Sequence, residues 1–330
     1  MTASDIPLLL IVFRRPDKTR QLIEALAKVK PTQVYILADG PRPGLPEEAR
    51  LCAEARAIAT DIPWECTIHT HFKDTNIGLT KNIDEGITWF FNEVEAGIIF
   101  EDDCIPDPTF FSFCAELLEY YKDDTNIMHI SGNNFQNGKT YGDGSYYFSH
   151  YSHSWGWATW RRAWQQYHVA VDNFPTYDKE NRINELPFSR AAKKFWMKHL
   201  RNGSHWDGLW LYTTWYSKGL CILPNQNLVT NIGYGEGATH TKTLTAQANV
   251  ANKPLYTINH PTQMVVSQEA DDYTFKALFY VPLHQKILLK LRGIISKILW
   301  LRARWLVAPQ PTQKVFKPKP SLNCTKETVL

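Results

Sequence analysis

The chain has 330 residues, 44% of them hydrophobic, and a formal net charge of +3 at pH 7, which predicts one α/β domain of about 250 residues plus an extension. The longest apolar run near the start, residues 8–13, is too short for a transmembrane helix or a secretory signal. Six scattered cysteines without a CxxC pair argue against a zinc site or a disulfide framework, so we expect a cytoplasmic protein with reduced thiols.

Short apolar stretches alternate with amphipathic stretches through the first hundred residues. Apolar side chains between Leu22 and Val29 recur at helical spacing after a first buried strand. The predicted strands are residues 7–13, 33–38, 67–71, 98–100, 127–132 and 220–224. The predicted helices are a segment that includes residues 22–29, residues 47–59, a segment through Phe91, residues 108–121, residues 195–200 and a segment through residues 210–215. This alternation predicts right-handed βαβ crossovers and a mostly parallel, twisted sheet with helices on both faces.

Three consecutive carboxylates, Glu101, Asp102 and Asp103, end the fourth predicted strand. Ligands bind outside the carboxyl ends of parallel strands, where Arg15 and Asp39 are expected to converge with these acids. Hard oxygen ligands at this edge suit Mg²⁺ or Mn²⁺, and a diphosphate can fill the remaining coordination positions. The alternative interpretation is a solvated loop that happens to be acidic.

The order of these features resembles the nucleotide-sugar-binding half of GT-A glycosyltransferases, including bacterial family-2-like transferases. The segment Asn76-Ile77-Gly78-Leu79 precedes a helix, and the acidic motif follows that helix. The Glu-Asp-Asp form is similar to that of the N-acetylglucosaminyltransferases that initiate complex N-glycans. The resemblance covers residues 7–241 and implies a GT-A fold. The chain departs from the commoner Asn-Arg-Pro opening at Arg14-Arg15-Pro16, which leaves the nucleobase contact open.

Most of the expected donor contacts follow from this resemblance. It implies that Asp39 accepts from a uracil imide, that Arg15 or Arg14 donates to the base, and that Asp102 meets the ribose. It also implies that Asp103 is the metal ligand. Lys81 follows the Gly78 turn and is a candidate phosphate contact. The predicted nucleotide-sugar-binding residues are Arg14, Arg15, Asp39, Asn76, Gly78, Lys81, Glu101, Asp102, Trp157 and His240.

The second half of the chain supplies the acceptor side of the predicted site. Four tryptophans between residues 155 and 164 could fill a core, but beside a glycine they also suit stacking on sugar faces, and we expect Trp157 to line the pocket. Asp207 is flanked by tryptophans, and partial desolvation by these side chains would raise the pKa of its carboxyl group toward that of a useful general base. A helix cap is the alternative role of Asp207. The glycine-rich stretch 233–241 is typical of a loop that closes over a donor, and His240 could approach the diphosphate.

The predicted domain is residues 1–275, with a nucleotide-binding half, 1–131, and an acceptor half, 132–275. Residues 283–307 carry lysines on one helical face and apolar residues on another, which is typical of a basic amphipathic helix at a membrane interface. Such a helix would place the protein on the inner face of an anionic membrane. The alternative is a helix that packs on the domain and leaves its lysines in water. Residues 308–330 are proline-rich and predicted to be disordered. The high apolar content of the tail argues against nucleic acid as a partner.

We therefore expect a metal-dependent, inverting glycosyltransferase of polysaccharide biosynthesis, with Mn²⁺ or Mg²⁺ as cofactor. It would move a hexosyl or N-acetylhexosaminyl group from a UDP-linked sugar to a hydroxyl of a glycan or lipid-linked acceptor, with Asp207 as catalytic base. One alternative is a sugar-nucleotide nucleotidyltransferase, although residues 13–16 lack the glycines of such enzymes. Another is a non-catalytic carbohydrate-binding or membrane-binding protein of the same fold.

Overall fold

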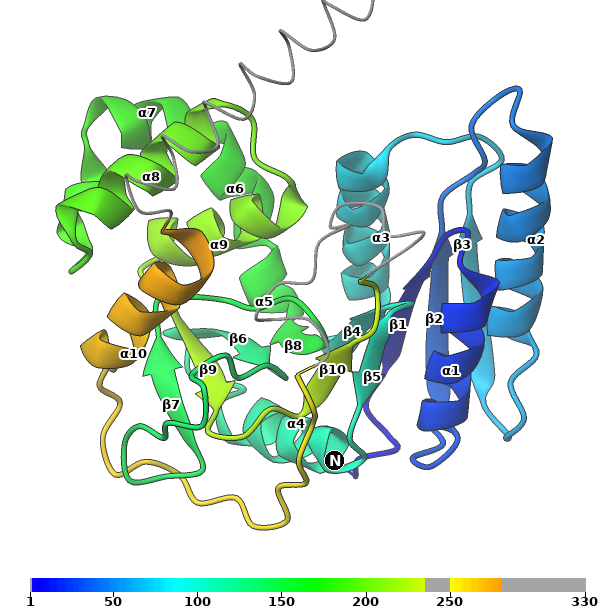
Figure 1. The fold of residues 1–330 in the computed structure, drawn as a ribbon, viewed down its shortest axis with the longest axis horizontal. Helices are drawn as coiled ribbons and strands as arrows, with labels where there is room; N and C mark the ends of the chain where they lie inside the picture. The colour runs from blue at the N-terminus through cyan, green and yellow to red at the C-terminus, as the bar shows by residue number, and fades with distance from the viewer. Residues whose placement is uncertain (1, 235–249, 281–330) are drawn as a thin grey trace, which may run out of the picture. The chain divides into compact units, whose positions relative to one another are not determined.

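The computed structural model describes residues 2–234 and 250–280, and these residues are built around an eight-stranded sheet (Figure 1). In spatial order its strands are β3 (Thr67–Phe72), β2 (Gln33–Ala38), β1 (Leu8–Val12), β4 (Ala96–Glu101), β8 (Trp157–Trp160), β6 (Ile127–Ser131), β9 (Leu220–Pro224) and β7 (Tyr146–Ser149). The short strands β5 (Cys104–Pro106) and β10 (Val229–Asn231) form a separate antiparallel pair.

The α-helices follow the strands along the chain. They are α1 (Pro16–Leu26), α2 (Pro46–Thr60), α3 (Leu79–Glu93), α4 (Thr109–Tyr120), α5 (Arg161–Trp164), α6 (Gln166–Asp172), α7 (Phe174–Lys179), α8 (Arg190–Arg201), α9 (Trp206–Tyr216) and α10 (Gln268–Thr274). A 3₁₀ turn covers Arg182–Glu185, and a π-helical turn, η2, covers Phe275–Phe279. None of the described helices is both long enough and apolar enough to cross a membrane.

Most strands of the sheet run parallel, as the alternation of strands and helices in the sequence predicts. Strands β1, β2, β3 and β4 pair in parallel, and so do β6 and β9. Two strands run against the others, because β8 pairs antiparallel with both β4 and β6, and β7 pairs antiparallel with β9. The predicted α/β fold class is therefore confirmed.

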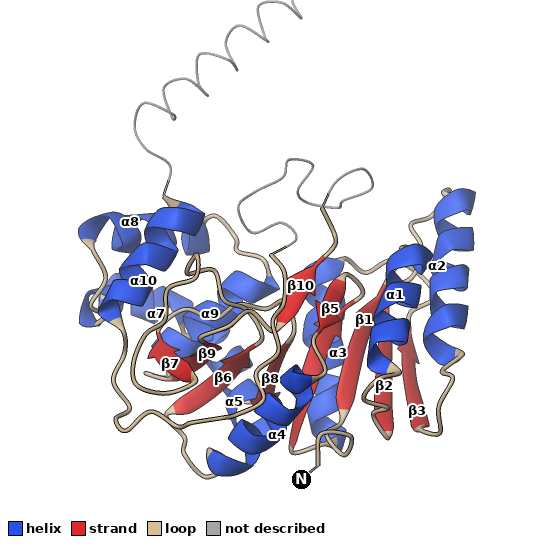
Figure 2. Ribbon diagram, turned by 60° about the horizontal axis from the view of Figure 1, so that its bottom comes forward, coloured by secondary structure: helices blue, strands red, loops and turns tan. Residues whose placement is uncertain are grey.

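Helices cover both faces of this sheet (Figure 2). Side chains alternate along β1, so Leu8 and Leu10 join one buried cluster with residues of α1 and α4, while Leu9 and Ile11 join another with residues of α3, α5 and α9. Every residue of β1 is buried, as expected for a central parallel strand covered on both faces.

Strand β8 is the main departure from the sequence prediction. It lies between β4 and β6, and all four of its residues are buried, so no polar-apolar alternation marks it as a strand. The Trp157 ring is 1% exposed and packs against His129 and Trp210, with ring centroids 5.1 Å and 5.5 Å away. The ring that we expected to line a sugar pocket therefore lies in the core.

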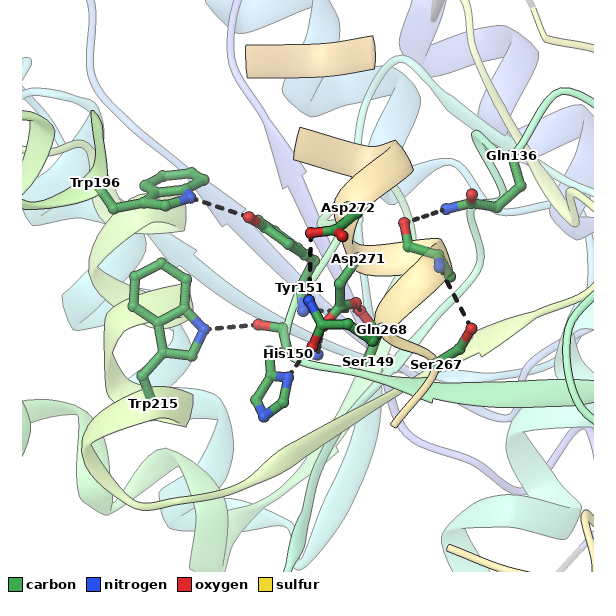
Figure 3. A network of polar contacts seen from close by, with 11 residues as sticks. Gln136, Ser149, His150, Tyr151, Trp196, Trp215, Ser267, Gln268, Asp271 and Asp272 are labelled. Carbon is green, nitrogen blue, oxygen red and sulfur yellow. Dashed lines mark hydrogen bonds and ion pairs between the residues drawn. The ribbon is translucent and has the colours of Figure 1, made fainter. Parts of the chain in front are cut away.

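A polar network ties α10 to the end of β7 (Figure 3). Asp271 on α10 is 1% exposed and accepts hydrogen bonds from the Ser149 hydroxyl, the His150 backbone N–H at 3.1 Å and His150 Nδ1 at 3.0 Å. Trp215 on α9 donates to the His150 carbonyl at 2.7 Å. The segment after β7 thus joins α9 and α10 in one packed unit.

Candidate active site

The acidic motif lies at the carboxyl edge of the sheet, next to the end of β1. Glu101 is the last residue of β4, and the parallel register pairs Ile11 with Glu101. The chain then turns through Asp102 and Asp103 into β5. The Ile232 N–H, just after β10, donates to the Asp103 carbonyl at 2.8 Å and so fixes the turn.

Arg15 is the cationic partner of this turn. It lies between β1 and α1, and its Nη1 donates to Asp103 Oδ2 at 2.8 Å while its Nη2 pairs with Asp102. Both terminal nitrogens thus pair with carboxylates, so Arg15, for which we expect a nucleobase contact, holds the acidic turn in place. A guanidinium suits this role because its planar fork can bind two carboxylates at once.

The acidic turn carries more negative charge than Arg15 can neutralise. Burial raises the pKa of Glu101 to about 8, and the charges of Asp103, Asp102 and Asp207 act in the same direction against Arg15. Burial likewise raises the pKa of Asp102 to about 6, with Arg15 opposing and Asp103 reinforcing the shift. A cation at this position would offset the surplus charge.

The carboxylates of this turn suit a hard divalent cation whose remaining ligands come from the substrate. Carboxylate oxygens are the ligands that Mg²⁺ and Mn²⁺ prefer, and the surplus negative charge would favour such an ion. Among the described residues, no three His, Cys, Asp or Glu side chains are grouped to hold a metal by themselves. The arrangement therefore suits an ion bound by one or two carboxylates together with a diphosphate.

Asp39 and Asn76 build the neighbouring turn. Asp39 is 6% exposed, and its carboxylate accepts from the backbone N–H groups of Gly40 at 2.8 Å, Ile77 at 3.0 Å and Gly78 at 3.1 Å. The Asn76 amide donates to the Gly40 carbonyl at 3.0 Å. Asp39, expected to read a nucleobase, therefore fixes the loop that leads into α3. Gly78 takes a positive φ of 89°, which favours glycine there.

Two further cations flank this edge of the sheet. Lys81 is exposed on the first turn of α3, and its Nζ lies 3.8 Å from a Glu85 oxygen, a loose pair that leaves the ammonium accessible. Arg14 donates to Glu48 at 2.9 Å, and Glu48 also binds Arg42. No sequence pattern indicated Glu48, because its partners come from two separate loops.

Gly233 comes closer to the acidic turn than any larger residue could. A Cβ at this position would lie 1.9 Å from Asp103 Oδ2 and 3.1 Å from Arg15 Nη1. Beside it, the Tyr234 ring meets the half-buried Trp155 edge-on, with centroids 5.7 Å apart. Trp155, rather than Trp157, is thus the tryptophan at this edge. His240 lies outside the described residues.

Asp207 approaches the acidic turn from the acceptor half. It lies in the first turn of α9, where a negative charge interacts favourably with the helix dipole, and its charge contributes to the raised pKa of Glu101. Trp206 and Trp210 are 4% and 0% exposed, whereas Asp207 is exposed. The tryptophans therefore anchor the helix in the core and do not enclose the carboxylate, which corrects the expected desolvation. His205, not Asp207, is the N-cap residue.

No protein-family model and no curated protein matches this sequence. Among solved structures, a mannosyltransferase from Pyrobaculum calidifontis in complex with GDP-Man and Mn²⁺ is 11% identical, with a TM-score of 0.31 over 66% of this chain and 71% of its own. A mannose-1-phosphate geranyltransferase from Thermus thermophilus is 10% identical, with a TM-score of 0.34 over 62% and 66%. Mouse xyloside xylosyltransferase 1, in its apo form, is 11% identical, with a TM-score of 0.32 over 64% and 81%.

Proposed function

We propose that this chain is a glycosyltransferase that uses a nucleoside-diphosphate sugar. One observation carries the proposal: the turn that ends β4 holds Asp102 and Asp103 around Arg15 at the carboxyl edge of the sheet. Carboxylates suited to binding a metal and a diphosphate, together with a separate exposed carboxylate, are the groups that a metal-dependent, inverting sugar transfer uses. The two groups come from different halves of the described chain, because the acidic turn follows β4 and Asp207 lies on α9.

The chain's own residues have distinct roles in this proposal. Asp103 would hold a divalent cation, which when bound supplies Lewis-acid stabilisation of the diphosphate. Arg15 holds Asp103 and Asp102 in place, and the absence of a side chain at Gly233 lets the backbone after β10 approach them without a clash. Lys81 is accessible for a phosphate oxygen.

Asp207 would accept the proton of the acceptor hydroxyl as that oxygen attacks the anomeric carbon. The bond between this carbon and the diphosphate breaks as the new glycosidic bond forms, so a single in-line displacement inverts the configuration. Exposure of Asp207 suits the role, because an acceptor must reach the carboxylate from solvent. A bound sugar would then cover the group and desolvate it.

The finer assignments belong to the same proposal. The donor is a UDP-linked hexose or N-acetylhexosamine, the cofactor is Mn²⁺ or Mg²⁺, and the acceptor is a glycan or lipid-linked hydroxyl. Residues 1–131 and 132–275 are the two halves of the catalytic domain. Residues 283–307, outside the described residues, are proposed to hold the protein on the inner face of an anionic membrane.

The test is nucleoside diphosphate release from a panel of UDP-, GDP- and TDP-sugars in the presence of Mn²⁺. Asp207→Asn should lower kcat about 10²-fold or more with nucleotide binding retained, because only the proton acceptor is lost. Asp103→Asn should weaken binding of the metal nucleotide as well.

The matched control is Asp61→Asn, which removes one exposed carboxylate at the end of α2 and should leave turnover unchanged. Pyrophosphate exchange in place of diphosphate release would identify a nucleotidyltransferase and contradict the proposal. Undiminished turnover by Asp207→Asn would remove Asp207 from the mechanism.

A further inference from the structure

Helix α8 is a strongly cationic element far along the chain from the acidic turn. Its twelve residues include five Lys or Arg and no Asp or Glu. The apolar face of the helix already packs in an aromatic cluster, where Trp196, Met197 and Leu200 are buried. The cations Arg190, Lys194, Lys198 and Arg201 are exposed on the remaining surface.

An open basin of about 490 Å³ lies beside this helix. Four cations line it, Arg190, Lys193, Lys194 and Arg201, and no acidic residue is among the described residues of its lining. Its apolar lining residues, Ile183, Phe188 and Met197, are between 4% and 7% exposed, so they form a closed floor. The basin is therefore a polar, cationic depression over packed core.

Much of the positive charge in this basin is uncompensated. Arg201 pairs with Asp178, with Nε 2.8 Å from Oδ2, and Lys193 donates to the Asn184 carbonyl at 3.2 Å. Arg190 and Lys194 form no ion pair with any residue in the part of the chain that the structure describes. Clustered cations repel one another, so an external anion that binds between them is stabilised.

The chain leaves the described residues next to this same helix. The η2 turn packs on α8, with the Phe279 ring centroid 4.8 Å from that of Trp196 and 5.9 Å from that of Phe195. Tyr280, which follows, is 44% exposed. The sequence that continues from it, residues 281–326, contains ten Lys or Arg and no Asp or Glu, interspersed with isoleucine, leucine and tryptophan.

We propose that α8 and its basin bind the phosphate headgroups of an anionic lipid surface. Each cation near such a surface contributes about 1 kcal/mol, and the basic sequence that continues the chain after Tyr280 would add to the binding through effective concentration. A lipid surface is favoured over nucleic acid because the tail sequence is too apolar to track a phosphate backbone, while it suits an interface. This inference concerns a surface separate from the acidic turn, and it stands whether or not the chain transfers a sugar.

Flotation of the full chain with lipid vesicles tests the proposal. The protein should float with vesicles that contain phosphatidylglycerol and stay behind with pure phosphatidylcholine vesicles. Replacing Arg190 and Lys194 with glutamine should lower the partition coefficient on anionic vesicles at least about tenfold, because two uncompensated cations are lost. The matched control, Arg20→Gln with Lys28→Gln, removes two exposed cations in and just after α1 and should change the partition by less than about twofold.

Several outcomes would overturn the inference. Failure of the wild-type chain to float, or flotation of the α8 variant equal to wild type, would show that α8 does not contribute. An equal loss in the α1 control would indicate a general charge effect. Release from vesicles by inorganic phosphate beyond that by chloride at equal ionic strength would point to a soluble phosphate ligand. Tighter binding of an RNA oligonucleotide than of vesicles, with the same α8 dependence, would point to nucleic acid.

Discussion

At the scale of single residues, the acidic turn depends on one guanidinium that bridges two carboxylates. Arg15→Lys keeps the charge but offers a single ammonium, so either Asp102, which is 2% exposed, or Asp103 loses its partner. We expect a loss of about 2 kcal/mol in the free energy of unfolding, measured by urea titration, because a buried carboxylate left unpaired is costly.

The adjacent Arg14 provides the matched control. Its partner Glu48 also binds Arg42, so Arg14→Lys leaves that carboxylate paired and should cost less than about 1 kcal/mol. Equal losses for the two variants would contradict a special role for the Arg15 bridge. The bridge itself could not be predicted from sequence, because it joins side chains 87 and 88 positions apart through the β1–β4 register. The acids could be predicted, since they follow a recognisable buried strand.

At the scale of elements, sequence periodicity located most of the nucleotide-binding half and missed much of the acceptor half. Strands β1, β2 and β4 are continuous apolar runs bounded by turns, which makes them recognisable. Residues 157–179 form β8 and three short helices, α5 to α7, but their frequent aromatic residues are buried on several sides. Strand β8 is fully buried and shows no alternation, and helices of four, seven and six residues are too short for a helical period to be detected. The tryptophans between residues 155 and 164 favour a sugar-stacking segment in the sequence for this reason.

Helix α10 is a short element that depends on one buried carboxylate for its attachment. Asp271→Asn retains the shape of the side chain but can no longer accept all three hydrogen bonds from Ser149 and His150. We expect a loss of about 2 kcal/mol in the free energy of unfolding, together with faster amide hydrogen exchange in α10. Asp272→Asn, at the next position, should cost less than about 0.5 kcal/mol. Unchanged exchange in α10 would contradict the anchoring role of Asp271.

At the scale of the whole molecule, buried ionisable groups on the two halves of the sheet make stability respond to pH in opposite directions. Burial lowers the pKa of His129 and of His153 to about 3. Trp210 donates to His129 Nδ1 at 3.1 Å, so His129 Nε2 carries the proton and donates to the His153 carbonyl at 3.1 Å. Both rings therefore remain neutral in the folded protein at mildly acidic pH.

The sign of the histidine effect follows from proton binding. An unfolded histidine takes up a proton near pH 6.5, whereas these folded histidines do so only near pH 3, so stability falls as pH decreases through this window. The slope is at most about 1.4 kcal/mol per pH unit for each histidine. Glu101 acts in the opposite sense, because its folded pKa of about 8 lies above its unfolded value. The stability that comes from tighter proton binding by folded Glu101 is lost as pH rises toward 8.

The histidine effect and the opposing Glu101 effect both act between pH 5 and 6.5. The decisive quantity is therefore the difference between wild type and a variant in how steeply the unfolding free energy depends on pH. His153→Phe removes one of these two buried imidazoles. The slope of its unfolding free energy against pH should therefore be lower than that of wild type by the contribution of one bound proton across this window, whatever its absolute stability. Urea titrations at several pH values measure both slopes, and parallel curves for wild type and His153→Phe would show that His153 is not held neutral by the fold.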